Sequence, residues 1–422
     1  MEKAFEDILR GKDGVRVEER SESGSVTGVV YSTEPEPGSN VMLTIDISLQ
    51  ETAEKSLAAR IEEIKELGEA GSTGGAADVA GGAVVVLDVK NFEILAAANY
   101  PTYSLKTFNE DYNDLLADPL GPMNNRAFMG LYQPGSTFKP STAVAALESG
   151  VITPSTKIMT KGIYTYYKGY QPACEIYLNY RGSHGLINVV DAIRVSCNYF
   201  FYEVGRLSGI DRMNTYAKML GLGEPTGVEL PEYTGILAGR EEREESGGTW
   251  YGGDTLAAAI GQSDNLFTPL QMAVYIASLV NPNGERLEAH LLKSVRTYDY
   301  SSTISEYQPK VLSTVDISDE TRETVMQGML QVSRRGSAVA TFGNYPIDVG
   351  SKTGTAQTGS GSPTGVFVAF APYDDPQIAV AVVVEHAGKG SIIGSVARDI
   401  FDAYFRTGSS FDAVQDEGAL ID

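Results

Sequence analysis

Both ends of this chain carry apolar runs of the kind that form buried β-strands. Residues 82–89 read Gly-Ala-Val-Val-Val-Leu-Asp-Val, a continuous run that is typical of a strand covered on both faces. A turn at Lys90-Asn91 then leads to a hairpin partner over residues 93–98. The pattern predicts one five-stranded sheet built from both ends of the domain, because three more strands are expected late in the chain, at residues 350–358, 366–371 and 378–385.

Helical periodicity fills most of the interval between these two groups of strands, as at residues 189–205 and 269–280. A long helix is also predicted over residues 49–67, and a last helix over residues 393–405. The chain therefore predicts a mixed α/β fold in which helices are inserted between the two halves of a sheet.

Three stretches divide the chain. Residues 1–39 are polar and charged, are too short to hold a core of their own, and end at a Pro-Glu-Pro-Gly turn sequence. Residues 40–410 contain the predicted main domain, and residues 411–422 are expected to form a C-terminal tail. Within the main domain, residues 69–82 are rich in Gly and Ala and predict a mobile loop.

The charge and the cysteine content argue against several kinds of function. A net charge of −22 in 422 residues disfavours nucleic acid as a partner, because phosphate contacts need a basic surface. Two cysteines, Cys174 and Cys197, are too few for a disulfide scaffold, although one bridge between them stays open. The three histidines are scattered, so neither a Ser-His-Asp triad nor a zinc site is indicated.

The sequence Ser136-Thr137-Phe138-Lys139 is the first of three short motifs that carry candidate chemistry. It follows a Pro-Gly turn and precedes an apolar helical run, so Ser136 is expected near a helix N-terminus, where free N–H groups favour an oxyanion. Lys139 follows three residues later and shares a helix face with Ser136. A buried lysine loses proton affinity and can act as a base toward a serine that has no histidine. The alternative is a serine cap followed by a surface lysine.

Two further motifs follow in order along the chain. Ser196-Cys197-Asn198 offers a hydroxyl that can relay a proton and an amide that can bind a substrate amide, although alone it also fits a polar turn between helices. Lys352-Thr353-Gly354 lies on a predicted edge strand, where Lys352 and Thr353 can hold the carboxylate of a peptide that pairs with the strand. Alone, this motif also fits an edge strand guarded by a lysine. The three motifs together are typical of serine acyl-transfer enzymes.

These motifs and their surroundings resemble the transpeptidase domain of class B penicillin-binding proteins over about residues 40 to 406. Asn125-Arg126-Ala127-Phe128 and the residues before Ser136 resemble the family's approach to its nucleophile. Trp250, Gly253-Asp254-Thr255 and Ile260-Gly261-Gln262-Ser263 resemble its elongation-type members. The resemblance implies the α/β (α+β) fold of penicillin-binding proteins and serine β-lactamases, with a central five-stranded antiparallel sheet flanked by helices and a mostly helical subdomain.

The resemblance also implies a peptidoglycan D,D-transpeptidase that cross-links stem peptides through a serine acyl-enzyme and is inhibited by β-lactam antibiotics. Ser136 would attack the carbonyl between two terminal D-alanines, Lys139 would take its proton, and Ser196 would help to protonate the departing D-alanine. Backbone N–H groups of Ser136 and Thr355 would form the oxyanion hole. No metal or organic cofactor is implied. The substrate would be held by Asn198, Lys352, Thr353, Gly354 and Thr355.

The chain departs from the family pattern at its start. Full-length members carry an N-terminal membrane helix and a complete pedestal domain, whereas here residues 1–39 resemble only the last piece of a pedestal. No stretch reaches the roughly 18 apolar residues of a membrane helix, and the charged start is not a signal peptide. We therefore interpret the chain as a truncated, soluble piece of a protein anchored at the extracytoplasmic face of the bacterial membrane, with a membrane glycosyltransferase as a partner. Cys197, inside the second motif, is expected to be a small buried residue.

Three other functions use a similar fold: a serine β-lactamase, a β-lactam sensor and a non-catalytic scaffold. A serine β-lactamase of class A needs a glutamate that positions the deacylating water. A glutamate four residues before an asparagine, the arrangement typical of those enzymes, does not occur between residues 199 and 351. A β-lactam sensor would be acylated without cross-linking, and a non-catalytic scaffold would usually have lost Ser136 or Lys139. Because both residues are present, the sequence favours the transpeptidase.

Overall fold

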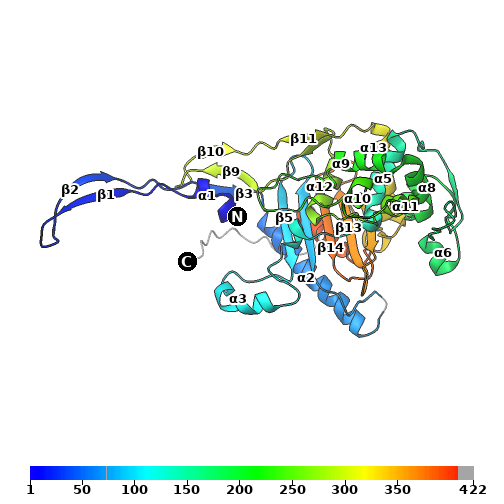
Figure 1. Cartoon of the computed structure of the whole chain (residues 1–422), viewed down its shortest axis with the longest axis horizontal. Coiled ribbons are helices and arrows are strands. Elements are labelled where there is room, and N and C mark those ends of the chain that lie inside the picture. The colour runs from blue at the N-terminus through cyan, green and yellow to red at the C-terminus, as the bar shows by residue number, and fades with distance from the viewer. Residues whose placement is uncertain (73, 407–422) are drawn as a thin grey trace.

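The computed structural model describes residues 1–72 and 74–406, and its centre is one five-stranded sheet. The strands span β4 Gly82–Asp88, β5 Ile94–Tyr100, β12 Gly350–Ala356, β13 Thr364–Ala371 and β14 Ile378–Val384. Their order is β12-β13-β14-β4-β5, and every neighbouring pair is antiparallel. Figure 1 shows strands from the two ends of the chain side by side in this sheet. The predicted five-stranded antiparallel sheet and the α/β fold class are therefore confirmed.

Helices cover both faces of this sheet. α2 (Ile47–Glu69) and α15 (Gly394–Phe405) pack together on one face, while α12 (Pro269–Val280) packs on the other. Every residue of β13 and β14 is buried as a result. α2 begins at the cap residue Asp46, and it buries one apolar stripe that consists of Leu49, Ala53, Leu57, Ile61 and Ile64.

A mostly helical part is inserted between β5 and β12. Besides α12, its helices span α3 Phe108–Ala117, α4 Arg126–Met129, the 3-10 helix η2 Gly135–Phe138, α5 Lys139–Glu148, α6 Glu175–Tyr180, α7 Val189–Arg194, α8 Asn198–Ser208, α9 Ile210–Met219, α10 Arg240–Glu245, α11 Gly252–Ala259, α13 Asp319–Arg335 and α14 Val339–Phe342. α5 packs against α8 and α9, α8 packs against α11, and α13 packs against α7 and β12. These contacts place the starts of α5 and α8 close to the edge of the sheet.

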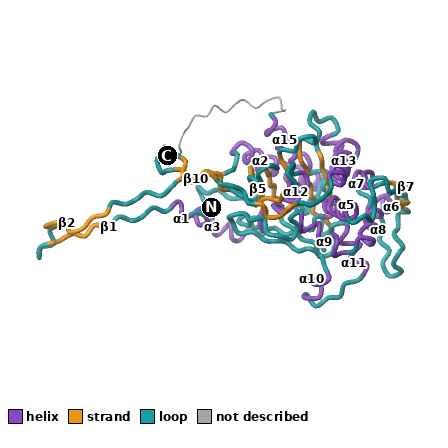
Figure 2. Tube along the Cα trace, turned by 90° about the horizontal axis from the view of Figure 1, so that it is seen from above, coloured by secondary structure: helices purple, strands orange, loops and turns teal. Residues whose placement is uncertain are grey.

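The first residues of the chain form an arm. After η1 (Glu2–Ala4) and α1 (Glu6–Leu9), the strands β1 (Val15–Arg20) and β2 (Val26–Thr33) make a hairpin that projects from the body in Figures 1 and 2. β3 (Asn40–Leu43) returns to the body and pairs with β9 (Leu292–Arg296), which also pairs with β10 (Thr303–Glu306). The remaining strand pairs are β6 Ile158–Thr160 with β7 Gly185–Ile187, and β8 Glu285–Leu287 with β11 Val311–Thr314. Among the helices of residues 1–72 and 74–406, none combines the length and the apolar character needed to cross a bilayer.

The helix predicted over residues 189–205 is wrong in one respect, because the structure breaks it at the second motif. α7 ends at Arg194 and α8 begins at Asn198. Between them Ser196 has a φ of +52°, in the left-handed region that helices of L-residues avoid. The N–H of Cys197 returns to the carbonyl of Ala192 at 2.9 Å and closes α7. The predicted tail at 411–422 lies outside the described residues.

Candidate active site

Ser136 lies in the first turn of η2, between the sheet and the helical part. Gly135 precedes it with a φ of +51°, and the Gly135 N–H donates to the carbonyl of Gly261 at 2.9 Å. On the other side, an added Cβ on Gly354 of β12 would lie 2.5 Å from the Pro134 carbonyl oxygen. Glycine at both positions therefore allows the backbones around Ser136 to approach each other closely.

Lys139 is the first residue of α5 and is completely buried, which excludes the alternative of a surface lysine. Its amine donates to Asn198 Oδ1 at 2.6 Å, to the Ser196 carbonyl at 2.8 Å and to Ser196 Oγ at 3.1 Å. Burial lowers the pKa of Lys139 to about 8. Within the described part of the chain, no hydrogen bond joins Lys139 to the Ser136 hydroxyl; such catalytic contacts often tighten only when substrate is bound.

Ser196 Oγ is shared by two buried lysines. Lys352 Nζ donates to it at 2.9 Å and to the Thr353 carbonyl at 2.9 Å. Burial, and after it the nearby Lys139, lowers the pKa of Lys352 well below its usual range. Two buried cations beside one hydroxyl repel each other, so we expect at least one of the two lysines to be neutral near neutral pH. The arrangement offers both a base and a proton donor around one hydroxyl.

The strand β12 forms an edge of the sheet and carries the third motif. Thr353 Oγ1 shares a hydrogen bond with Ser337 Oγ at 2.7 Å, and the Gly390 N–H donates to Thr355 Oγ1 at 3.3 Å. An added Cβ on Gly135 would lie 3.3 Å from the backbone nitrogen of Thr355, so the backbones of η2 and β12 are neighbours here. The edge of β12 can pair with an extended peptide. The neighbouring backbone N–H groups of η2 and β12 can stabilise an oxyanion.

The structure thus brings residues from all three motifs together. Lys139, Ser196, Asn198 and Lys352 form one hydrogen-bonded group, and Ser136, Thr353, Gly354 and Thr355 lie on the adjoining η2 and β12. Ser337 was not found by sequence reasoning. It belongs to no motif, and it reaches Thr353 only because the end of α13 packs beside β12.

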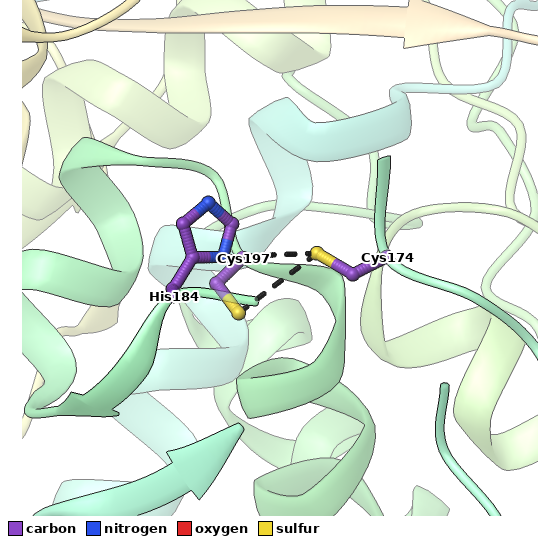
Figure 3. A group of neighbouring side chains, drawn as sticks. All are labelled: Cys174, His184 and Cys197. Atoms are coloured by element: carbon purple, nitrogen blue, oxygen red, sulfur yellow. Dashed lines mark hydrogen bonds between the residues drawn. The ribbon is translucent and has the colours of Figure 1, made fainter. Parts of the chain in front are cut away.

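A second group of side chains lies directly beside the second motif (Figure 3). Cys174 Sγ is 4.0 Å from Cys197 Sγ and 3.9 Å from His184 Nδ1, and the three possible ligand atoms lie within 4.8 Å of one another. Both cysteines are buried free thiols, so the bridge that the sequence left open is not formed. Contact with Cys174, together with burial, raises the pKa of the Cys197 thiol.

No sequence pattern indicates this group, because its members are spaced unlike a zinc motif. Cysteine and histidine are nevertheless ligand types that Zn²⁺ takes in proteins, so these three residues could hold a soft divalent metal ion. Cys197 lies between Ser196 and Asn198 in the chain, and the expectation that it is buried is confirmed. The group therefore lies next to the turn that contains Ser196.

Comparison with known proteins supports the acyl-transfer chemistry that the geometry of the site indicates. Residues 82–402 match the family described as penicillin binding protein transpeptidase domain. The chain is 32% identical over 430 residues to the peptidoglycan D,D-transpeptidase MrdA of Escherichia coli K12, covering 95% of this chain and 63% of that protein. It therefore spans less than two thirds of the length of this relative.

Two solved structures have similar folds. One, described as showing the structural coordination of polymerization and crosslinking by a peptidoglycan synthase complex, has a TM-score of 0.84 and 31% identity, with 98% of this chain and 71% of that chain covered. The other is the complex between penicillin-binding protein PBP2 and MreC from Helicobacter pylori, with a TM-score of 0.81 and 26% identity, covering 97% of this chain and 72% of that chain.

Proposed function

Because this chain belongs to the penicillin-binding protein transpeptidase domain family, we propose that it is the catalytic part of a peptidoglycan D,D-transpeptidase. One observation carries the proposal: Lys139 and Lys352 both donate to Ser196 Oγ, and Asn198 accepts from Lys139, beside the turn that holds Ser136. This group offers a base, a proton relay and an amide-binding side chain around one nucleophile, which are the parts that acyl transfer requires.

In the first half-reaction, Ser136 Oγ attacks the carbonyl carbon between the last two D-alanines of a stem peptide. Its proton passes to Lys139, which must be neutral to accept it. The C–N bond then breaks, and Ser196 passes a proton to the departing amine. The products are free D-alanine and an ester between Ser136 and the remaining peptide. The N–H groups of Ser136 and Thr355 stabilise the negative oxygen that forms on the way.

In the second half-reaction, the amine of a neighbouring stem peptide attacks this ester. A new amide bond forms, the ester C–O bond breaks, and Ser136 regains a proton. A β-lactam would acylate Ser136 in the same way, but its leaving amine stays attached to the acyl group after the ring opens. The amine then continues to occupy the site, which accounts for slow release of the drug.

The substrate would lie along the free edge of β12. Lys352, Thr353 and Thr355 would hold the terminal carboxylate, because a lysine and two hydroxyl groups can all donate to carboxylate oxygens. Gly354 would leave room for the peptide backbone. Asn198 would bind a peptide amide as both donor and acceptor.

The domain organisation, partners and location of the protein are also part of the proposal. We propose that residues 1–39 are the end of a pedestal, that residues 40–410 form the transpeptidase domain, and that residues 411–422 are a tail. Two similar structures contain a peptidoglycan synthase complex and a complex with MreC. In keeping with these, the protein would work beside a membrane glycosyltransferase at the outer face of the bacterial membrane, with stem peptides and β-lactams as its ligands.

An exchange reaction tests the proposed function. The chain is incubated with a peptide that ends in D-Ala-D-Ala and with an excess of an amine acceptor, and the products are identified by mass. We expect a new amide between donor and acceptor, and none with Ser136→Ala. Ser141→Ala is the matched control, because Ser141 lies in the helix that follows and its buried hydroxyl has no hydrogen-bond partner among the described residues. Hydrolysis without exchange, or exchange that survives in Ser136→Ala, would contradict the proposal.

A further inference from the structure

A cavity of about 500 Å³ lies at the start of α11, outside the catalytic group. It is lined by two segments that are far apart in the chain. The loop before α6 contributes Tyr167 and Tyr170, and the start of α11 contributes Tyr251 and Asp254. The lining therefore combines three aromatic rings with one carboxylate.

The aromatic wall of this cavity is held in place by packing. An added Cβ on Gly252 would lie 2.4 Å from the ring of Tyr167, and one on Gly253 would lie 2.9 Å from the ring of Tyr170. Bare backbone at these two positions lets both rings pack directly on α11. Tyr167 also meets the ring of Tyr166 edge-on, with 4.9 Å between centroids. The aromatic wall of the cavity is thus fixed by its packing on α11.

Asp254 supplies negative charge to the cavity. One of its carboxylate oxygens accepts from the Tyr251 N–H at 2.7 Å, and the other lies 3.6 Å from the guanidinium of Arg243. The hydrogen bonds of Arg243, however, go to Asp264 at 2.6 Å and to Ser263 at 3.2 Å. One cation therefore faces two carboxylates, which leaves a net negative charge at this wall.

The surroundings of the cavity are acidic as well. Figure 2 shows α10 and α11 at one edge of the helical part, and residues 240–264 carry six carboxylates against two arginines. On the tyrosine loop, Lys168 is the charged residue of the segment 163–173, and it is exposed. Faces of aromatic rings attract cations, and a carboxylate beside them strengthens this preference. The cavity therefore favours an ammonium group.

The cavity also lies next to the substrate-binding side of the site. α8, which begins at Asn198, packs against α11. Tyr202 of α8, four residues after Asn198, is buried, and its ring centroid lies 5.8 Å from that of Tyr164. The Tyr164 centroid in turn lies 6.5 Å from that of Tyr166, the ring that meets Tyr167 of the cavity. A peptide held at Asn198 would thus have its neighbouring side chain close to the tyrosines.

We propose that this cavity binds the protonated side-chain amine of the donor stem peptide. The inference rests on the proposed function, because cross-linking requires stem peptides that carry an amine. When such a stem serves as the donor, its own amine does not react and remains a cation. Asp254 and the rings of Tyr167 and Tyr170 would hold it, and they would select amine-bearing donors.

Two peptides that differ in one acetyl group test this proposal. They are Nα-acetyl-Lys-D-Ala-D-Ala and its Nε-acetylated form, and the measured quantity is kcat/KM for release of D-alanine. We expect the unmodified chain to prefer the free amine by about tenfold. Asp254→Asn keeps a carbonyl oxygen to cap α11 but removes the charge, and it should reduce the preference to about twofold. Tyr170→Leu should reduce it as well.

Glu244→Gln is the matched control, because it removes an exposed carboxylate of α10 outside the cavity and should leave the preference unchanged. Equal rates for the two peptides, or an unchanged preference in both Asp254→Asn and Tyr170→Leu, would overturn the proposal. Acylation of Ser136 by benzylpenicillin, whose side chain has no amine, should be the same in all of these variants. If benzylpenicillin did not acylate the unmodified chain, that result would instead contradict the proposed function. Failure of the amine-binding proposal and failure of the proposed function therefore give different results.

Discussion

At the scale of single residues, the proposed acyl transfer depends on two buried lysines. We expect that the two are not both protonated at the same time. Lys139 and Lys352 are both fully buried and both donate to Ser196 Oγ. Burial removes the hydration that stabilises an ammonium ion, so the neutral amine becomes accessible near physiological pH. In the proposed mechanism, packing thus supplies the base that Ser136 needs, without a histidine.

The first prediction concerns the pH dependence of acylation. The pKa of Lys139 is lowered to about 8, and only the neutral amine can accept the proton of Ser136. The acylation rate constant should therefore rise as pH increases from 6 to about 8 and level off above that value. Lys139→Ala should lower the plateau rate by about 10²- to 10⁴-fold and remove this rise. The measurement is the rate of labelling by a fluorescent penicillin at a series of pH values.

Lys218→Ala is the control for this series, since Lys218 is an exposed lysine of α9. It should keep both the rate and the pH profile. A Lys139→Ala variant that retained the same rise with pH would show that another group is the base.

At the scale of elements, the site depends on the close approach of β12 to η2. We predict that Gly354→Ala slows acylation by at least about tenfold, because its Cβ would lie 2.5 Å from the Pro134 carbonyl oxygen and would push the two elements apart. Gly359→Ala is the matched control, since an added Cβ there meets no atom of residues 1–72 and 74–406 within 4 Å. Penicillin labelling and thermal melting of both variants test this, and equal labelling of the two would contradict it.

Sequence reasoning was most successful for elements with a strong local pattern. The buried strands and α12 were predicted within a few residues of their ends, because their apolar runs and turn residues are local signals. The helix predicted over residues 189–205 did not include the break between α7 and α8, which matches the alternative interpretation of the second motif as a polar turn between helices. The left-handed Ser196 is held there by tertiary contacts with Lys139 and Lys352, which no local pattern records.

The residues of the candidate site also fall into those that local motifs indicate and those that only tertiary packing brings together. Ser136, Lys139, Ser196, Asn198 and Lys352 belong to short motifs, and their proximity could be anticipated from the family resemblance. Ser337 and the group of Cys174, His184 and Cys197 could not be anticipated, because they meet only through the packing of segments distant in the chain.

At the scale of the whole molecule, an ionic contact made by a buried arginine connects the residues before η2 to the C-terminal strands of the sheet. Arg126, which lies ten residues before Ser136, is buried, and its Nε donates to Glu385 at 2.9 Å, just after the end of β14. Tyr132 donates its hydroxyl hydrogen to the same carboxylate at 2.7 Å. The contact thereby connects the sheet strands of the C-terminal part to the approach of Ser136.

We predict that Glu385→Ala lowers the free energy of unfolding by about 3 kcal/mol, because it leaves a buried guanidinium without its carboxylate partner. Urea unfolding followed by circular dichroism measures this change. Glu36→Ala, which breaks the exposed pair with Lys12, should produce no measurable change. Equal stability of the two variants would show that the Arg126 contact is dispensable.

The central claim is that Ser136 is the nucleophile of an acyl-transfer enzyme, and the mass of the intact protein after mixing with benzylpenicillin tests it most directly. We predict one adduct per chain that lasts for hours, that maps to the peptide containing Ser136, and that is absent from Ser136→Ala. An adduct of undiminished amount in Ser136→Ala, or the absence of any adduct in the unmodified chain, would contradict the account.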